Sequence, residues 1–227
     1  MLKKTTLLLT IFLFIESALA SGVSLGTTRV IYPTDSDQVK LKIYNSDKES
    51  SYLVQSWISD ENNNKVTDII ITPPLFVMKP NSDNILNVVY TGDKNNLPKD
   101  REKMFYLNSK VIPSLNEEEQ KIDNALLISS TTKIKLFIRP SEIKENSFKS
   151  YEELRCSFIK DKLKIDNPTP FYINLVSLNN NGNELSKGET LPPKSFTLIN
   201  VEKKVNDVNF NFINDYGVQI KNKSCNF

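Results

Sequence analysis

The chain has 227 residues, and its 29 basic and 27 acidic side chains leave a formal net charge of +2. This length suits one large β-domain or two small domains, and so small a net charge gives no reason to expect nucleic acid as a partner. The sequence contains no histidine. Its absence excludes Ser-His-Asp and Cys-His catalysis, histidine proton shuttles and the usual zinc sites.

The N-terminus has the pattern of a secretory signal peptide over residues 1–20. Two lysines form a basic start, residues 7–15 form an apolar run, and Ala-Leu-Ala at 18–20 is a small-residue cleavage site. The apolar run is shorter than the roughly 20 residues that a membrane-spanning helix needs. We therefore predict cleavage after Ala20 and an exported chain that does not insert into a membrane.

Most of the remaining chain has the pattern of short β-strands. Alternating or β-branched segments follow one another at spacings of about 8–12 residues, with turn-forming sequences such as "DENNNK" and "KPNSDN" between them. This spacing is typical of an all-β sandwich. The predicted strands are 39–45, 52–58, 84–90, 104–112, 162–166, 171–178, 195–201, 208–213 and 217–221.

The predicted domain boundary follows Pro140. Residues 141–153 are polar and show no alternation, so we interpret them as a linker. They separate an N-terminal domain, 21–140, from a C-terminal domain, 154–227, and each is near the size of an immunoglobulin-like domain. The predicted fold class is therefore all-β, with two immunoglobulin-like β-sandwich domains.

Cys156 and Cys225 are the only cysteines of the chain. An even number of cysteines in an exported protein favours a disulfide, and two free thiols are the alternative.

The segment "TTKIKLFIRP" at 131–140 alternates like a strand with two different faces. One face carries Lys133, Lys135 and Arg139, and the other carries Ile134, Leu136 and Ile138. The cations by themselves fit a solvated edge strand as well as a functional surface, because lysine is a common guard against edge-to-edge aggregation.

The apolar face of this segment continues backward through Ser130 to Ile128 and Leu126. A strand from Leu126 to Ile138 would span about 40 Å, roughly twice the usual strand length. A small sandwich cannot bury that whole stripe, so we expect its first part to extend beyond the core. Its exposed apolar edge could then pair with a strand of another chain. The alternative is a turn near Ser129 that divides the stretch into two ordinary strands.

Five motifs spread over the mature chain resemble periplasmic pilus-assembly chaperones of the PapD type. They are "VSLGTTRVIYP" (23–33), "LPKDREKMFYLN" (97–108), "TKIKLFIRP" (132–140), "DNPTPFYINL" (166–175) and "INDYG" (213–217). The resemblance implies a boomerang of two immunoglobulin-like domains in the periplasm. Such chaperones bind pilus or fimbrial subunits, lend them a missing strand and deliver them to an outer-membrane usher, without cofactor, metal or catalysis.

The resemblance also implies roles for particular residues. Arg29 and Lys135 match the cations that anchor the C-terminal carboxylate of the subunit, and Lys133 has no assigned role. Glu102, Arg139 and Asp215 match an ion network between the domains.

Leu126, Ile128 and Ser130 match the donor-strand stripe, where a serine replaces one of the usual large apolar residues and leaves the depth of that contact open. The short segment before the last strand resembles the short-loop subgroup, and a Cys156–Cys225 bridge is expected to join the first and last strands of the second domain.

Other functions remain to be weighed against this one. The first is an exported β-sandwich adhesin or fibre subunit, which would lack its final strand and carry an N-terminal donor extension. The second is an enzyme on a sandwich scaffold, for which the sequence offers no acid, base or nucleophile set outside the ion network. The identity of the subunit and any self-association of the free protein stay open.

Overall fold

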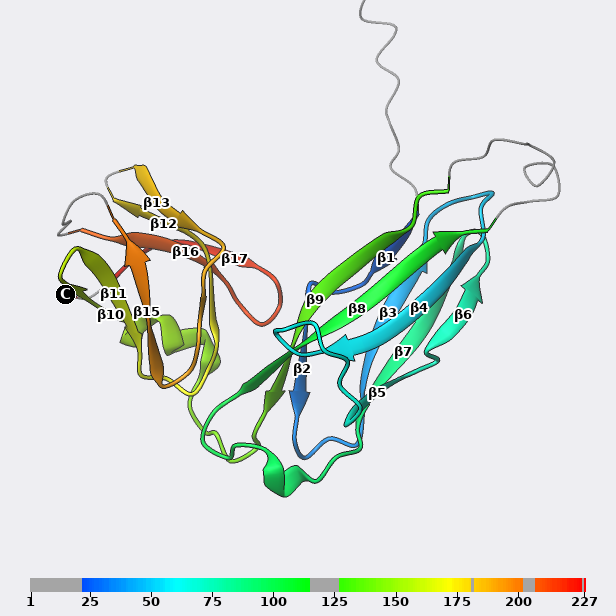
Figure 1. Ribbon diagram of the computed structural model, residues 1–227, viewed down its shortest axis with the longest axis horizontal. Coiled ribbons are helices and arrows are strands. Elements are labelled where there is room, and N and C mark those ends of the chain that lie inside the picture. Colours follow the sequence, from blue (N-terminus) through cyan, green and yellow to red (C-terminus); the bar gives the residue numbers. More distant parts are fainter. Residues whose placement is uncertain (1–21, 115–126, 181, 202–206, 226) are drawn as a thin grey trace, which may run out of the picture.

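A computed structural model describes residues 22–114, 127–180, 182–201, 207–225 and 227. These residues form two β-sandwiches that meet near one end of each, so the molecule has the outline of a boomerang (Figure 1). The predicted all-β fold with two immunoglobulin-like domains is confirmed. The predicted signal peptide lies outside the described residues, and no helix within them is long and apolar enough to span a membrane.

The strands and 3-10 helices, in chain order, are β1 (Val23–Leu25), β2 (Arg29–Pro33), β3 (Val39–Asn45), β4 (Tyr52–Ser59), β5 (Ile69–Thr72), β6 (Leu75–Met78), β7 (Ser82–Tyr90), η2 (Lys94–Asn96), β8 (Lys103–Pro113), β9 (Ser130–Arg139), η4 (Ser147–Glu153), β10 (Arg155–Ile159), β11 (Lys162–Asn167), β12 (Ile173–Asn180), β13 (Asn183–Lys187), β14 (Thr190–Leu191), β15 (Ser195–Asn200), β16 (Asn209–Ile213) and β17 (Gln219–Ser224).

The first domain packs a sheet of order β1-β3-β7-β5 against a sheet of order β2-β9-β8-β4-β6. The chain passes from one sheet to the other at every connection from β1 to β8, and the Thr72–Pro73 peptide bond between β5 and β6 is cis. The alternation seen in the sequence places one apolar face of each sheet inward, with Ile43, Leu107 and Leu136 fully buried. Because of the first crossing, β2 lies beside β9 as a parallel edge strand.

The second domain packs a sheet of order β10-β11-β15 against a sheet of order β13-β12-β16-β17, to which β14 adds beside β12. Its core is a separate cluster that includes Leu163, Leu178 and Phe210. Cys156 in β10 and Cys225 directly after β17 form a disulfide with their Cα atoms 5.8 Å apart. The predicted bridge between the two ends of this domain is thus present in the structure.

Part of the segment predicted as a linker forms a 3-10 helix that packs on the second domain. Within 141–153, η4 begins after Asn146, whose side chain accepts a hydrogen bond from the N–H of Phe148. Ser150 is buried, and the ring of Tyr151 lies 4.8 Å from that of Phe212 in β16. The sequence did not predict this helix, because a short 3-10 helix has no long apolar period to detect.

The loop between β16 and β17 reaches back to the first domain (Figure 1). Gly217 in this loop has a φ of +78°, and a Cβ added there would lie 2.5 Å from Thr28 Oγ1, just before β2. The positive φ favours glycine, and any larger residue would require the Thr28 side chain to move. The junction is therefore closely packed at this point.

The long strand predicted from Leu126 is shorter in the structure. β9 begins at Ser130, which pairs with Val111 of β8, and residues 127–129 belong to no strand. Two residues further along, β8 ends at Pro113, and proline has no N–H to continue the ladder. The prediction of a continuous strand through Ile128 is therefore wrong for the described residues, and Leu126 lies outside them.

Candidate functional site

One edge of β9 is open along its first half. β8 pairs with β9 from Ser130 to Ile138, whereas β2 pairs with it only from Lys135 to Arg139. Between Ser130 and Ile134, β9 therefore has a hydrogen-bonded neighbour on one side only, within the part of the chain that the structure describes. The unpaired N–H and C=O groups of such an edge can accept a further strand.

Arg29 and Lys135 stand where this open edge ends. Arg29 is the first residue of β2 and lies opposite Lys135 in the parallel register. Arg29 Nη1 donates to the carbonyl oxygen of Ile213, 3.2 Å away in the second domain. Lys135 Nζ donates to Asn174 Oδ1 and Thr190 Oγ1, each 2.5 Å away and also in the second domain. Both cations thus reach across the junction.

The two cations are poorly compensated. Arg29 is 8% exposed, and its Nε is buried with no hydrogen-bond partner among the described residues. Burial lowers the pKa of Arg29, although Asp215 and Glu102 act in the opposite direction. Burial and then the charge of Arg29 lower the pKa of Lys135 to about 8. Neither side chain forms an ion pair with a carboxylate in the described ranges, so an added anion would stabilise both.

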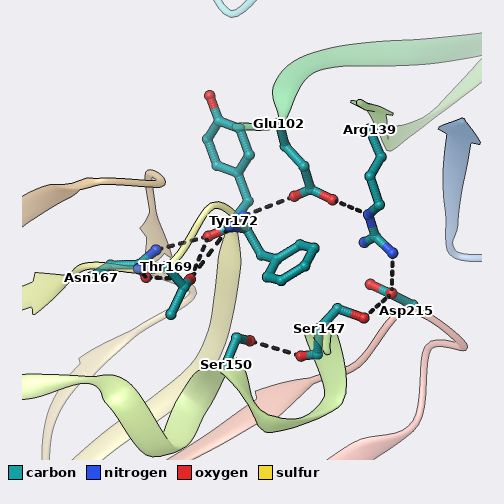
Figure 2. Close-up of polar contacts among 9 residues, drawn as sticks. Glu102, Arg139, Ser147, Ser150, Asn167, Thr169, Tyr172 and Asp215 are labelled. Atoms are coloured by element: carbon teal, nitrogen blue, oxygen red, sulfur yellow. Dashed lines mark hydrogen bonds and ion pairs between the residues drawn. The ribbon is translucent and has the colours of Figure 1, made fainter. Parts of the chain in front are cut away.

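A second cluster, centred on Arg139, joins the two domains a few residues away. Arg139 Nε contacts Glu102 Oε1 at 2.7 Å, and its Nη1 contacts Asp215 Oδ2 at 2.8 Å. Figure 2 shows that both carboxylates have further donors. The N–H of Tyr172 donates to Glu102 Oε2, and the hydroxyl of Ser147 donates to Asp215 Oδ2, each at 2.8 Å. The structure therefore brings together all three residues of the expected ion network.

The electrostatics of this cluster depend on its burial. Glu102 is 3% exposed, and its burial raises the pKa of the carboxyl group although Arg139 lowers it. Burial works against the charge of Arg139, but the two carboxylates outweigh it and raise the pKa of the guanidinium. The guanidinium also lies 4.9 Å from the ring of Phe171. Removing Arg139 would leave buried negative charge without a cation to balance it.

Further contacts between the domains surround the cluster. The N–H of Glu102 donates to the carbonyl oxygen of Pro170 at 2.9 Å, and the rings of Phe137 and Tyr172 lie 5.5 Å apart. Backbone, aromatic and ionic contacts together fix how one domain sits on the other.

Lys133 shares the face of Lys135 but has different partners. It is exposed, donates to Asn63 Oδ1, and lies 4.0 Å from the centre of the Tyr106 ring. All of these partners belong to the first domain. Lys133 therefore does not take part in the junction.

The overhanging part of the apolar stripe is exposed where the structure describes it. Ile128 is 70% exposed and Leu127 49% exposed, and neither belongs to the hydrophobic core of the first domain. Ser130 is exposed at the start of β9, whereas the same face becomes core from Ile134 onward. The side chains of this face thus pass from exposed to buried within β9.

Several residues of the site were not predicted. Ser147 and Thr190 carry no sequence signal, because each contacts a side chain that is distant in the chain, Asp215 for Ser147 and Lys135 for Thr190. Asn174 interrupts the apolar run "FYINLVSL" and is buried, so its polarity at a core-like position was a signal available in the sequence.

The fold and the site define an all-β protein of two immunoglobulin-like domains with a tightly joined corner and an open strand edge that ends at two cations. Residues 22–144 match the family "Pili and flagellar-assembly chaperone, PapD N-terminal domain", and residues 149–224 match "Pili assembly chaperone PapD, C-terminal domain". The chain belongs to this family of PapD-like pilus-assembly chaperones.

Individual relatives agree with the family assignment. The chaperone protein LpfB of Salmonella typhimurium is 37% identical over 92% of this chain and 90% of its own length. The crystal structure of the periplasmic chaperone SfaE superimposes with a TM-score of 0.76 at 33% identity, covering 91% of this chain and 100% of that one. The SafB chaperone of Salmonella enterica, solved in complex with the SafA pilin, gives a TM-score of 0.80 at 29% identity over 93% of this chain and 99% of that one.

Proposed function

We propose that this protein is a periplasmic chaperone that binds pilus or fimbrial subunits by donor-strand complementation and delivers them to an outer-membrane usher. The observation that carries the proposal is the open edge of β9 that ends at Arg29 and Lys135. The function so proposed is binding and transfer of a folded partner, not catalysis. The solved complex of the SafA pilin with the SafB chaperone supports it.

The geometry of β2 explains what an added strand would do. β2 occupies the place beside β9 from Lys135 onward, so a strand added along Ser130–Ile134 must stop where β2 begins. If it runs in the direction of β2, its last residue arrives beside Arg29 and Lys135. A C-terminal carboxylate is the group that those two cations lack.

The anchored carboxylate would also set the register. Once the terminus is fixed, each residue of the added strand is committed to one position along β9, and a slip of one residue would turn its side chains to the wrong face. In return, the stripe of Leu126, Ile128 and Ser130 offers apolar side chains to the partner. Ser130 provides little apolar surface, so most of the contact falls to the two larger residues.

Self-association of the free protein through the same exposed stripe is an extension of this proposal. A second copy could cover Ile128 when no subunit is bound. Sedimentation velocity over a range of concentrations tests this extension, and a sedimentation coefficient independent of concentration contradicts it.

The stripe gives a direct test of the proposed function. The chain carrying Leu126→Asp and Ile128→Asp should fold normally, because Ile128 lies outside the core, but should not retain subunits. Tagged wild-type and variant chains would be purified from periplasm, and the co-purified proteins identified by mass spectrometry. Subunits recovered equally with both chains would contradict the proposal, and an unfolded variant would show that the stripe is structural.

A further inference from the structure

The ammonium group of Lys135 is held by a small polar patch of the second domain. Its acceptors, Asn174 on β12 and Thr190 on β14, are direct neighbours across that strand pair. Asn174 is buried, so the patch cannot move independently of the domain. A lysine side chain is otherwise flexible about its four-carbon stem, and these two bonds restrict it to one position.

The patch is polar but uncharged. An ammonium group has three N–H donors, and the two acceptors in the described residues use two of them. The neighbouring strands add no negative charge, since Arg29 lies beside Lys135 on β2 and Tyr106 lies opposite on β8. Lys135 is therefore fixed in place while its charge remains available to an incoming anion.

We propose that Asn174 and Thr190 are positioning residues, which hold Lys135 so that its remaining donor meets the terminal carboxylate of a bound subunit. Their neutrality is essential to this role, because an acidic residue in the same place would pair with Lys135 and compete with the subunit. This inference rests on the proposed function. It adds that the anchor is assembled from both domains, so the first domain alone would hold Lys135 loosely.

The substitution Asn174→Asp separates positioning from simple packing. It keeps the shape of the side chain but places a carboxylate against Lys135 Nζ. The control is Asn179→Asp, which adds the same charge to the same strand but about 17 Å further along it. Asn179 donates to Ser177 and makes no contact with Lys135.

The first measurement needs no subunit. The titration of Lys135 is followed by NMR of lysine-labelled protein in the wild type and both variants. In Asn174→Asp the pKa of Lys135 should rise from about 8 by about one unit or more, since an opposite charge in contact favours the protonated form. In Asn179→Asp it should not change. An unchanged pKa in Asn174→Asp overturns the proposed contact.

The second measurement uses synthetic peptides with the C-terminal sequence of a co-purified subunit, one with a free carboxylate and one amidated. The wild type and Asn179→Asp should bind the free acid more tightly than the amide, by about tenfold or more. Asn174→Asp should lose this preference. A preference that survives in Asn174→Asp overturns the positioning role alone, whereas no preference in the wild type overturns the carboxylate anchor of the proposed function.

A second pair of variants covers the case in which Asn174→Asp fails to fold. Thr190→Val removes the hydroxyl acceptor at nearly constant volume, and Thr190→Ser restores it. The valine variant should lower the pKa of Lys135 further and weaken the free-acid preference, because the charged form loses a hydrogen bond. The serine variant should match the wild type. If serine and valine behave alike, the hydroxyl does not hold Lys135.

Discussion

Arg29 and Lys135 lie side by side although like charges repel, and burial lowers the pKa of both. Such an arrangement costs free energy in the free protein unless a negative charge arrives from outside. The contrast with Arg139 is informative, because its two carboxylates are supplied within the chain. The same strand thus carries one cation whose charge is balanced within the chain and another that no carboxylate of the described residues pairs with.

The lowered pKa of Lys135 leads to a pH dependence of binding. A bound carboxylate raises this pKa, so binding takes up a proton when the pH exceeds the free value of about 8. Affinity for a subunit should therefore be constant below that pH and fall above it. Lys135→Arg should remove this dependence, because arginine stays protonated throughout. Wild-type affinity that is unchanged from about pH 7 to about pH 9 would contradict the expectation.

The titration of Lys135 does not itself destabilise the fold over this pH range. In the unfolded chain Lys135 keeps its proton up to its ordinary pKa of 10.5, whereas in the folded protein it loses the proton near 8. Between these values the unfolded state binds more protons, so the contribution of Lys135 to the free energy of unfolding increases as the pH rises. A loss of affinity in that range therefore reports on the anchor.

At the residue scale, the sequence reveals the cations more readily than their partners. Arg29, Lys135 and Arg139 lie in motifs that resemble a known family. Their partners in the second domain, such as Asn174 and Thr190, depend on how one domain is placed on the other. No local pattern encodes that placement, because each contact joins residues distant in the chain.

At the scale of elements, alternation predicts strands well where one face is core. Residues 39–45 were predicted and form β3 with the same bounds. The pattern fails where the apolar face is not buried in this chain, as it does before Ser130. An apolar stripe predicts burial, but the partner that buries it can be another molecule. The pairing of β8 with β9 ends at Val111 and Ser130, two residues before β8 ends at Pro113.

The disulfide is expected to support the second domain more than the site. It closes a loop with a sequence separation of 69 residues, which in the chain-entropy model stabilises by about 4 kcal/mol. The double variant Cys156→Ser, Cys225→Ser should unfold at lower denaturant concentration, as measured by circular dichroism. Adding a reductant should destabilise the wild type and leave the double variant unchanged. Equal stability of the wild type and the double variant in the absence of reductant would contradict this expectation.

At the scale of the whole molecule, the angle between the domains is set by a few contacts at one corner. Glu102, Arg139 and Asp215 link the domains through charge, and Gly217 permits the loop before β17 to approach Thr28. The sequence supports the presence of two sandwiches by its strand spacing. Their mutual orientation follows only from the family resemblance, since it depends on side chains that meet across the junction.

Arg139→Ala tests whether this corner determines the shape. The variant leaves Glu102 and Asp215 without their cation, and loss of one partner of a buried pair typically costs about 3–5 kcal/mol. The partial exposure of Asp215 places the expected loss near the lower end. Small-angle scattering should show a changed or broader distribution of domain angles, and thermal unfolding should begin earlier. Unchanged scattering together with unchanged melting would mean that the cluster does not determine the orientation.

The account as a whole depends on Lys135 as an anchor for a subunit carboxylate at the end of an open strand edge. The most direct test compares Lys135→Ala with Lys133→Ala, because the two lysines lie on one face of β9 and only Lys135 reaches the second domain. Arg29 is less suitable, since its burial couples it to folding.

The measurement is the amount of subunit that co-purifies from periplasm with each variant at matched chaperone levels. Loss of a charge-assisted hydrogen bond should weaken binding by about tenfold to a hundredfold, so Lys135→Ala should recover little subunit. Lys133→Ala should recover as much as the wild type. Equal recovery by the two variants, whether both high or both low, would contradict the assignment of Lys135 as the anchor.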